Sequence, residues 1–137
     1  MDLYEAIHDR RTIHSYAPHP MESGVLERVL GAAHLAPNHK LTWPWRFLVV
    51  GSETRHALVP IAFELKNAMD PLIQGKIRQK LINPSALVVV TQILDSNGDE
   101  FRIREDYAAT CCAIQNMMLA ARAEGLGSKW STGALTH

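Results

Sequence analysis

The feature that most constrains this fold is a long segment, residues 103–124, that contains neither proline nor glycine. Such a segment can stay helical throughout, and Gly125 directly after it is the residue type that most readily ends a helix. Apolar residues occupy most of its circumference, and many are alanine or cysteine, which let another backbone approach closely. We therefore expect a long buried helix, in the core or at a subunit interface.

The only two cysteines, Cys111 and Cys112, are neighbours in this helix. Adjacent helical side chains point about 100° apart, which disfavours both a disulfide and a shared metal ion. We expect two reduced, small core residues, with a vicinal redox pair as the less favoured alternative. Because the seven histidines form no HxH or HExxH pattern, we expect no metal site.

The rest of the chain predicts an ordinary mixed fold. Apolar residues recur at three- and four-residue spacing over 21–35, which indicates an amphipathic helix that ends before Pro37. The short apolar runs 47–50 and 86–90 are typical of interior strands. Between them, residues 53–80 favour helix but contain Pro60 and Pro71, so two or three short helices are expected. With 137 residues, we expect a single domain over residues 1–137.

Charge and hydropathy exclude several classes of partner. Fourteen Lys and Arg balance fourteen Asp and Glu, so the composition does not favour binding to nucleic acid or to an anionic membrane. The N-terminus lacks the apolar core of a signal peptide, and no run approaches the ~18 apolar residues of a membrane span. We expect a cytoplasmic protein in which any anion site is local.

Three segments carry residues suited to ligand binding. In the first, Arg10, Arg11, Thr12 and His14 follow a short amphipathic helix. Guanidinium groups bind phosphate bidentately, and the hydroxyl and imidazole add short-range donors. The more ordinary interpretation, which residues 10–14 alone favour, is a solvated basic helix end.

The second segment, residues 36–47, is a polar loop that leads directly into a strand. Its tryptophans offer flat surfaces to a ring system, although Trp45 is better explained as a core residue. Asn38 and His39 fit a structural role and a binding role equally well. In the third segment, residues 125–133, glycines and hydroxyls would let the backbone approach a planar ligand. Taken alone, this segment is only a loop.

In this order, the three segments resemble the motifs of the nitroreductase family. They correspond to residues 10–16, residues 36–47 with the Ala-Pro-Asn-His loop of the small-subunit branch, and residues 115–133. The resemblance covers nearly the whole chain. It implies an α+β fold with a central, mostly antiparallel sheet flanked by helices, and a homodimer that binds FMN at the subunit interface. It also implies hydride transfer from NAD(P)H through the flavin to a nitroaromatic, quinone-like or other electron-poor acceptor.

The resemblance assigns roles to individual residues. Arg10, Arg11 and Thr12 would hold the FMN phosphate and ribityl chain, His14 is a weaker candidate beside them, and His39 would reach the flavin of the partner subunit. The residues along the isoalloxazine ring would be Trp130, Ser131, Thr132 and Gly133. Because the flavin performs the chemistry, no side chain is assigned as catalytic.

The chain also departs from the family pattern. Leu41 and Trp43 stand where many relatives carry Asn, Gln or Glu, and Trp43 could stack on the flavin instead. Relatives continue through a further helix and strand, so the resemblance implies a C-terminally truncated fold. We expect such a fold to expose a hydrophobic sheet edge, and the chain to be poorly soluble or to bind FMN weakly. Two other interpretations remain: a non-catalytic module that binds flavin or a nucleotide phosphate, and an inactive fragment.

Overall fold

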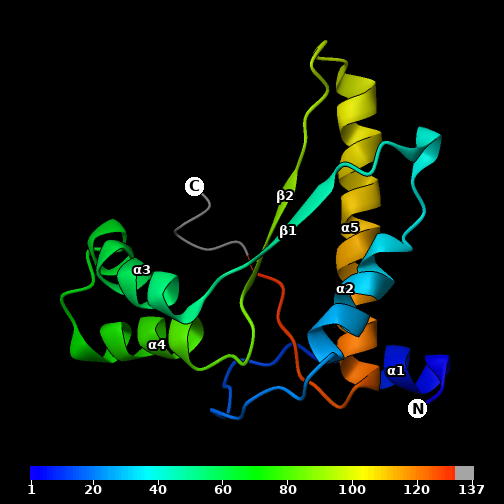
Figure 1. The fold of residues 1–137 in the computed structure, drawn as a ribbon. Helices are drawn as coiled ribbons and strands as arrows, with labels where there is room; N and C mark the ends of the chain where they lie inside the picture. The colour runs from blue at the N-terminus through cyan, green and yellow to red at the C-terminus, as the bar shows by residue number, and fades with distance from the viewer. Residues whose placement is uncertain (132–137) are drawn as a thin grey trace.

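The computed structural model describes residues 1–131 and shows an α+β fold, as the sequence predicted (Figure 1). No helix within these residues has both the length and the hydropathy to cross a membrane. The elements in chain order are α1 (Leu3–Asp9), α2 (Val25–His34), the 3-10 turn η1 (His39–Leu41), β1 (Trp45–Val49), α3 (Ser52–Leu65), α4 (Pro71–Ile82), β2 (Val88–Gln92) and α5 (Glu100–Ala123).

The long helix predicted from the sequence is α5, which has 24 residues. It begins three residues earlier than expected because the Asp99 carboxylate accepts hydrogen bonds from backbone N–H groups of the first turn. At its end, Gly125 has a φ of 79°. The N–H groups of Gly125 and Leu126 donate to the carbonyls of Arg122 and Ala121 at 3.0 and 2.8 Å. This pattern is a Schellman motif, so the predicted helix end is confirmed.

One face of α5 forms the core of the described residues. It packs against α2, and Trp45 of β1 is buried beside it with 1% of its surface exposed. The buried residues of α5 follow helical spacing and are Asp106, Ala109, Thr110, Ala113, Ile114, Met118 and Ala121. The prediction that Trp45 belongs to the core is confirmed.

The cysteine prediction was partly wrong. Cys111 is half-buried, Cys112 is exposed, and both are free thiols. The small size of Cys112 favoured a core position, but its place on the helix excludes one. The buried face of α5 passes through positions 109, 110, 113 and 114, and position 112 projects outside that stripe.

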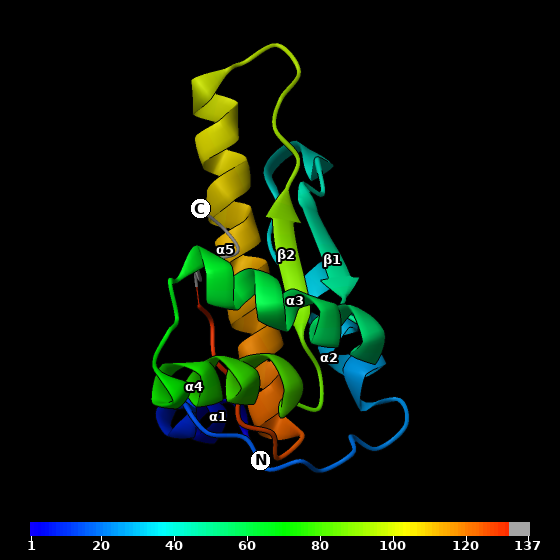
Figure 2. The ribbon, with the colours of Figure 1, turned by 90° about the vertical axis from the view of Figure 1, so that its left-hand side faces the viewer.

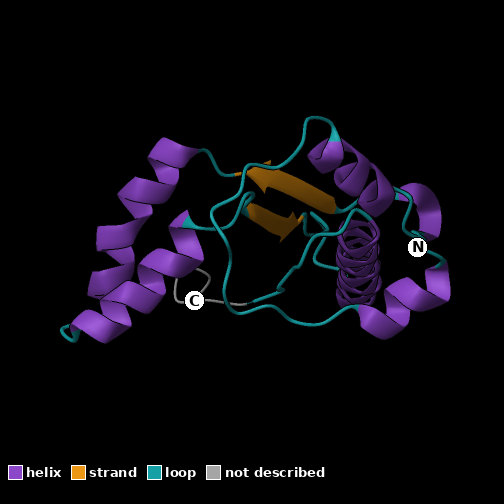
Figure 3. Ribbon diagram, turned by 90° about the horizontal axis from the view of Figure 1, so that it is seen from below, coloured by secondary structure: helices purple, strands orange, loops and turns teal. Residues whose placement is uncertain are grey.

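The sheet consists of β1 and β2, which pair antiparallel with Phe47 opposite Val90. Phe47 packs against the α2–α5 core, whereas Leu48 on the other face is 64% exposed. The prediction of two interior strands was therefore wrong within the described residues, because helices α2 and α5 cover the sheet on the Phe47 side only. Figure 3 shows the sheet between α5 and the α3–α4 pair.

Helices α3 and α4 form a hairpin inserted in the chain between the two strands. In Figure 2, α3 crosses in front of the lower end of the sheet and α4 lies below it. Pro71 begins α4, as expected, but Pro60 lies inside α3 without ending it. Buried Ala62 and Ile77 pack between the helices, and this burial offsets the hydrogen bond that Pro60 removes. The guanidinium of Arg55 donates to backbone carbonyls at both ends of the insertion and so joins α3 to the sheet.

Candidate functional site

Two of the three candidate segments meet at the C-terminal end of α5. Thr12 and Ser128 form a parallel β-bridge, in which the N–H of Ile13 donates to the Ser128 carbonyl at 3.1 Å. Beside this bridge, the Nζ of Lys129 lies 3.3 Å from the Nδ1 of His14. The fold therefore joins residues 10–14 and 127–131, which are more than 110 positions apart in the chain.

The bridge requires a glycine at position 127. A Cβ atom placed on Gly127 would lie 2.6 Å from the Cγ1 of Ile13, which is closer than real Cβ contacts. The two backbones can approach only because position 127 has no side chain. Gly127 therefore sets the spacing between the basic segment and the segment that follows α5.

Most of the predicted residues at this end of the molecule are accessible. Arg11, Thr12 and His14 are exposed, Arg10 is half-buried, and Trp130 is 47% exposed. Ser131 is also exposed and has a polar or ring partner within the structure. Thr132 and Gly133 lie outside the described residues.

The guanidinium of Arg11 donates to the backbone carbonyls of His8 and Arg10, the latter at 2.9 Å. These carbonyls belong to the C-terminal end of α1, so Arg11 stabilises a helix end as the alternative interpretation proposed. The two roles are compatible, because a guanidinium has five N–H donors. Arg11 is thereby held in place next to Thr12.

Ion pairs hold α1 and α2 against the last turn of α5. Arg28 of α2 donates two hydrogen bonds to the carboxylate of Glu124, each at 2.7 Å, and they keep the pKa of Glu124 below its ordinary value. Asp9 lies 3.5 Å from Arg122, and its pKa is lowered first by the hydrogen bond from His8 and then by Arg122. Such exposed pairs add little stability, but they fix where residues 127–131 begin.

His39 lies elsewhere. Its Nδ1 is 3.1 Å from the Oε1 of Glu105, near the N-terminal end of α5. At a rise of about 1.5 Å per residue, Glu105 is about 24 Å along the helix from Ala121, next to which the other two segments meet. Within one subunit, His39 and residues 10–14 therefore lie at opposite ends of α5.

The loop that carries His39 has an unusual backbone. Lys40, Leu41 and Trp43 have φ angles of 57°, 53° and 40°, in the left-handed region that residues other than glycine avoid. Each such residue costs on the order of 1–3 kcal/mol and persists only where its surroundings enforce it. The Trp43 side chain in this loop is 52% exposed.

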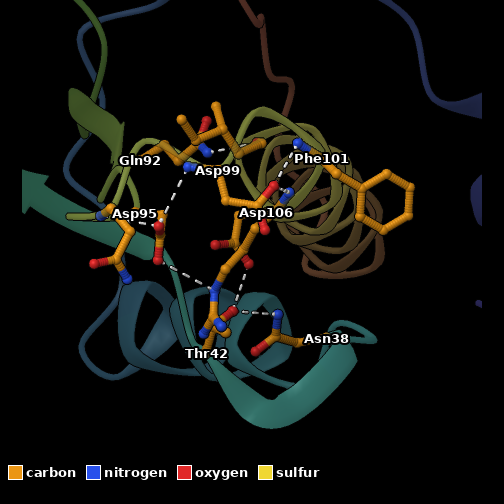
Figure 4. A network of polar contacts seen from close by, with 10 residues as sticks. Asn38, Thr42, Gln92, Asp95, Asp99, Phe101 and Asp106 are labelled. Carbon is orange, nitrogen blue, oxygen red and sulfur yellow. Dashed lines mark hydrogen bonds and ion pairs between the residues drawn. The ribbon is translucent and has the colours of Figure 1, made fainter.

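A short hydrogen-bond chain holds the loop against α5 (Figure 4). The Oγ1 of Thr42 donates to Asp106 at 2.5 Å and accepts from the Nδ2 of Asn38 at 2.9 Å. The Oδ1 of Asn38 accepts from the backbone N–H of Trp43 at 2.6 Å. A cavity of about 90 Å³ lies beside this chain and is lined by residues of η1 and of the first two turns of α5.

Comparison with known families decides what this arrangement is. The family model described as the Nitroreductase family matches residues 7–136. The chain belongs to the nitroreductase family. The match includes all three candidate segments, so the resemblance found in the motifs and the nitroreductase-like fold are both confirmed.

Individual members of the nitroreductase family agree with this assignment. YfhC of Bacillus subtilis (strain 168), whose name assigns it provisionally to the NAD(P)H nitroreductases, is 34% identical and aligns with 98% of this chain and 71% of its own length. The crystal structure of a nitroreductase-like family protein from Bacillus cereus has a TM-score of 0.77 and 29% identity, over 97% of this chain and 71% of that one.

A second structure shows the nitroreductase fold together with a ligand. The protein comes from Desulfovibrio desulfuricans and was crystallised in complex with FMN; it has a TM-score of 0.73 and 24% identity, over 98% of this chain and 70% of that one. At this identity the likeness concerns the fold. Each of the three relatives is longer than the present chain.

The sequence motifs did not single out three residues that organise this candidate site. Lys129 was part of the third segment but received no role, although a cation next to Gly-Leu-Gly-Ser is a usable signal for an anion site. Thr42 and Asp106 became visible only in the structure, because 64 positions separate them. The sequence could have indicated Asp106, because an acidic residue on the apolar face of a helix needs a polar partner.

Proposed function

We propose that this nitroreductase-family chain is an FMN-dependent oxidoreductase that transfers hydride from NAD(P)H to an electron-poor acceptor, such as a nitroaromatic or quinone-like compound. The observation that carries the proposal is the bridge between Thr12 and Ser128, because it assembles a local basic site from two separate motifs. Relatives with NAD(P)H nitroreductase names support the reaction class.

The residues at the bridge suit the phosphate and ring of FMN. Arg10, Arg11, His14 and Lys129 are basic, and Thr12 adds a hydroxyl, which together form a donor set for a phosphate dianion. The absence of a side chain at Gly127 keeps the two backbones close, and the exposed Trp130 offers an aromatic surface. We assign Ser131, Thr132 and Gly133 to the ring side of the same site.

In this proposal the bound FMN supplies the redox chemistry, since it can accept a hydride and pass it on. Residues 10–14 would hold the phosphate, and residues 130–133 would lie along the ring. Because the flavin rather than a side chain reacts, the chain needs no nucleophile or general base. We therefore assign binding roles only.

We also propose that two copies of the chain form the complete site. His39 is held at the opposite end of α5, so it would serve the FMN bound by a partner subunit. An apolar groove of about 340 Å³ between α1, α2 and α5 supports association. Leu3 and Leu35 beside it are 62% and 83% exposed, and exposed apolar surface of this kind is typical of subunit contacts.

Arg11→Ala should weaken FMN binding about ten- to a hundredfold, because a charge-assisted contact to phosphate is worth about 1.5–3 kcal/mol. Equilibrium titration of the flavin fluorescence measures this. Arg78→Ala, which removes an exposed arginine of α4, is the control and should leave FMN binding unchanged. Equal FMN affinity in the wild type and in Arg11→Ala would contradict the phosphate role. Tight FMN binding without NAD(P)H oxidation would instead favour a non-catalytic flavin module.

Leu35→Lys should lower the association constant of the chain, because it places a charge at the apolar groove. The free energy of unfolding of the single chain should hardly change, since Leu35 is exposed there. Sedimentation velocity over a concentration series measures the association. Leu72→Lys on α4, whose leucine is 75% exposed, is the matched control. A wild-type chain that stays monomeric at every concentration would contradict the dimer.

A further inference from the structure

We propose that Asp106 is a positioning residue of the FMN site, which acts through Thr42 on the loop that carries His39 and Trp43. The inference rests on the proposed function, because it assumes that this loop contacts the flavin. Asp106 itself faces the loop from inside the protein and would touch neither the cofactor nor the substrate (Figure 4).

The burial of Asp106 needs an explanation. Asp106 is 5% exposed and lies on the face of α5 that otherwise consists mainly of alanine and other apolar residues. Removing a carboxylate from water is costly, and an apolar residue of similar volume would commonly be as stable or more stable there. Stability alone therefore does not explain an aspartate at position 106, and we infer that it serves to hold one particular arrangement of its hydrogen-bond partners.

The hydrogen bonds give that specificity a direction. A carboxylate only accepts, so the hydroxyl hydrogen of Thr42 must point toward Asp106. Thr42 is then left to accept from the amide nitrogen of Asn38. This fixes the orientation of the Asn38 amide, with its oxygen toward the backbone N–H of Trp43.

The loop needs such an anchor because its backbone is strained. Lys40, Leu41 and Trp43 all lie in the left-handed region. The hydrogen bond between Asn38 and Thr42 closes the segment that contains the first two of them. The other contact to α5, between His39 and Glu105, joins side chains that are 61% and 32% exposed and therefore contributes little. The partly buried bond from Thr42 to the buried Asp106 is the stronger restraint on the loop.

Three variants of the full chain test the proposal. Asp106→Leu and Thr42→Val each break the hydrogen-bond chain, whereas Asp106→Asn keeps an oxygen that can accept from Thr42. Thr110→Val is the matched control, because Thr110 is also buried on α5 but its hydroxyl donates to the backbone carbonyl of Asp106 and not to the loop. The readouts are hydrogen exchange of the Trp43 amide by NMR and FMN affinity by fluorescence titration.

In Asp106→Leu and Thr42→Val, the Trp43 amide should exchange about tenfold faster or more, and FMN should bind about tenfold more weakly. Asp106→Asn should recover most of both properties, and Thr110→Val should change neither. If Asp106→Leu does not fold, Thr42→Val decides, since it removes the same bond at the half-buried Thr42 and leaves the buried carboxylate unchanged. Unchanged Trp43 exchange in a folded Thr42→Val variant would overturn the proposal.

The two hypotheses fail separately. A wild-type chain with a protected Trp43 amide but no affinity for FMN would contradict the proposed function and leave the loop anchor intact. Fast exchange at Trp43 in Thr42→Val with wild-type FMN affinity would show that Asp106 orders the loop but does not position it for the cofactor, which overturns the inference alone.

Discussion

Replacing Trp45 by alanine should lower the free energy of unfolding by about 3–5 kcal/mol, the usual effect of removing a large core side chain. Trp45 is 1% exposed and packs among small residues of α2 and α5, so its loss would leave a cavity that they cannot fill. Its Nε1 also donates to the Nδ1 of His34 at 3.0 Å. Because domains are stable by only about 5–15 kcal/mol, this change removes a large share of the total.

Urea denaturation followed by circular dichroism measures the effect, and Trp43→Ala is the matched control. Trp43 is two positions away but 52% exposed, so its removal should change the stability by less than about 1 kcal/mol. Similar losses from the two variants would show that the core assignment of Trp45 is wrong.

Gly127→Ala should weaken FMN binding about tenfold to a hundredfold, because overpacking of this kind costs about 1–3 kcal/mol. The added Cβ would lie 2.6 Å from the Cγ1 of Ile13, and a β-branched side chain has little freedom to move away. The strain would be relieved by separating the two backbones, which breaks the Thr12–Ser128 bridge. Fluorescence titration with FMN measures the loss.

A compensating substitution makes this prediction specific. In the Ile13→Ala/Gly127→Ala double variant the clashing atoms are absent, so FMN affinity should return to that of Ile13→Ala alone. Gly31→Ala is the control, because a Cβ there would meet nothing within 4 Å. If the double variant binds FMN as weakly as Gly127→Ala, the steric explanation fails.

Local sequence signals predicted the elements whose causes are local. Most of α5 was predicted from the absence of proline and glycine, and its end was predicted from Gly125, because glycine adopts the left-handed backbone found there most readily. The burial of Trp45 was predicted for the same kind of reason, since it lies in a proline-fixed connection that leads directly into an apolar strand. The three motifs also sufficed to identify the family, which the match over residues 7–136 confirms.

Features that depend on distant contacts were not predictable in this way. Cys112 is a small residue of a type common in cores, yet it is exposed. The packing of α5 against α2 decides which side of the helix is buried, and Cys112 lies on another side. Pro60 did not end α3, because contacts with α4 outweigh one lost hydrogen bond. The link between Thr42 and Asp106 and the close approach of Gly127 to Ile13 each join residues far apart in sequence, and no local pattern encodes them.

The contacts near the two ends of α5 fix the number of residues that the helix can have between them. Asp106 must face Thr42 while Ala121 packs against Val25 and Val29 of α2, so one inserted residue would turn the second contact by about 100° and shift it by about 1.5 Å. A whole extra turn would restore the direction but displace the end by about 5.4 Å. We therefore expect insertions and deletions to be tolerated better in exposed connections such as residues 17–20 than within α5.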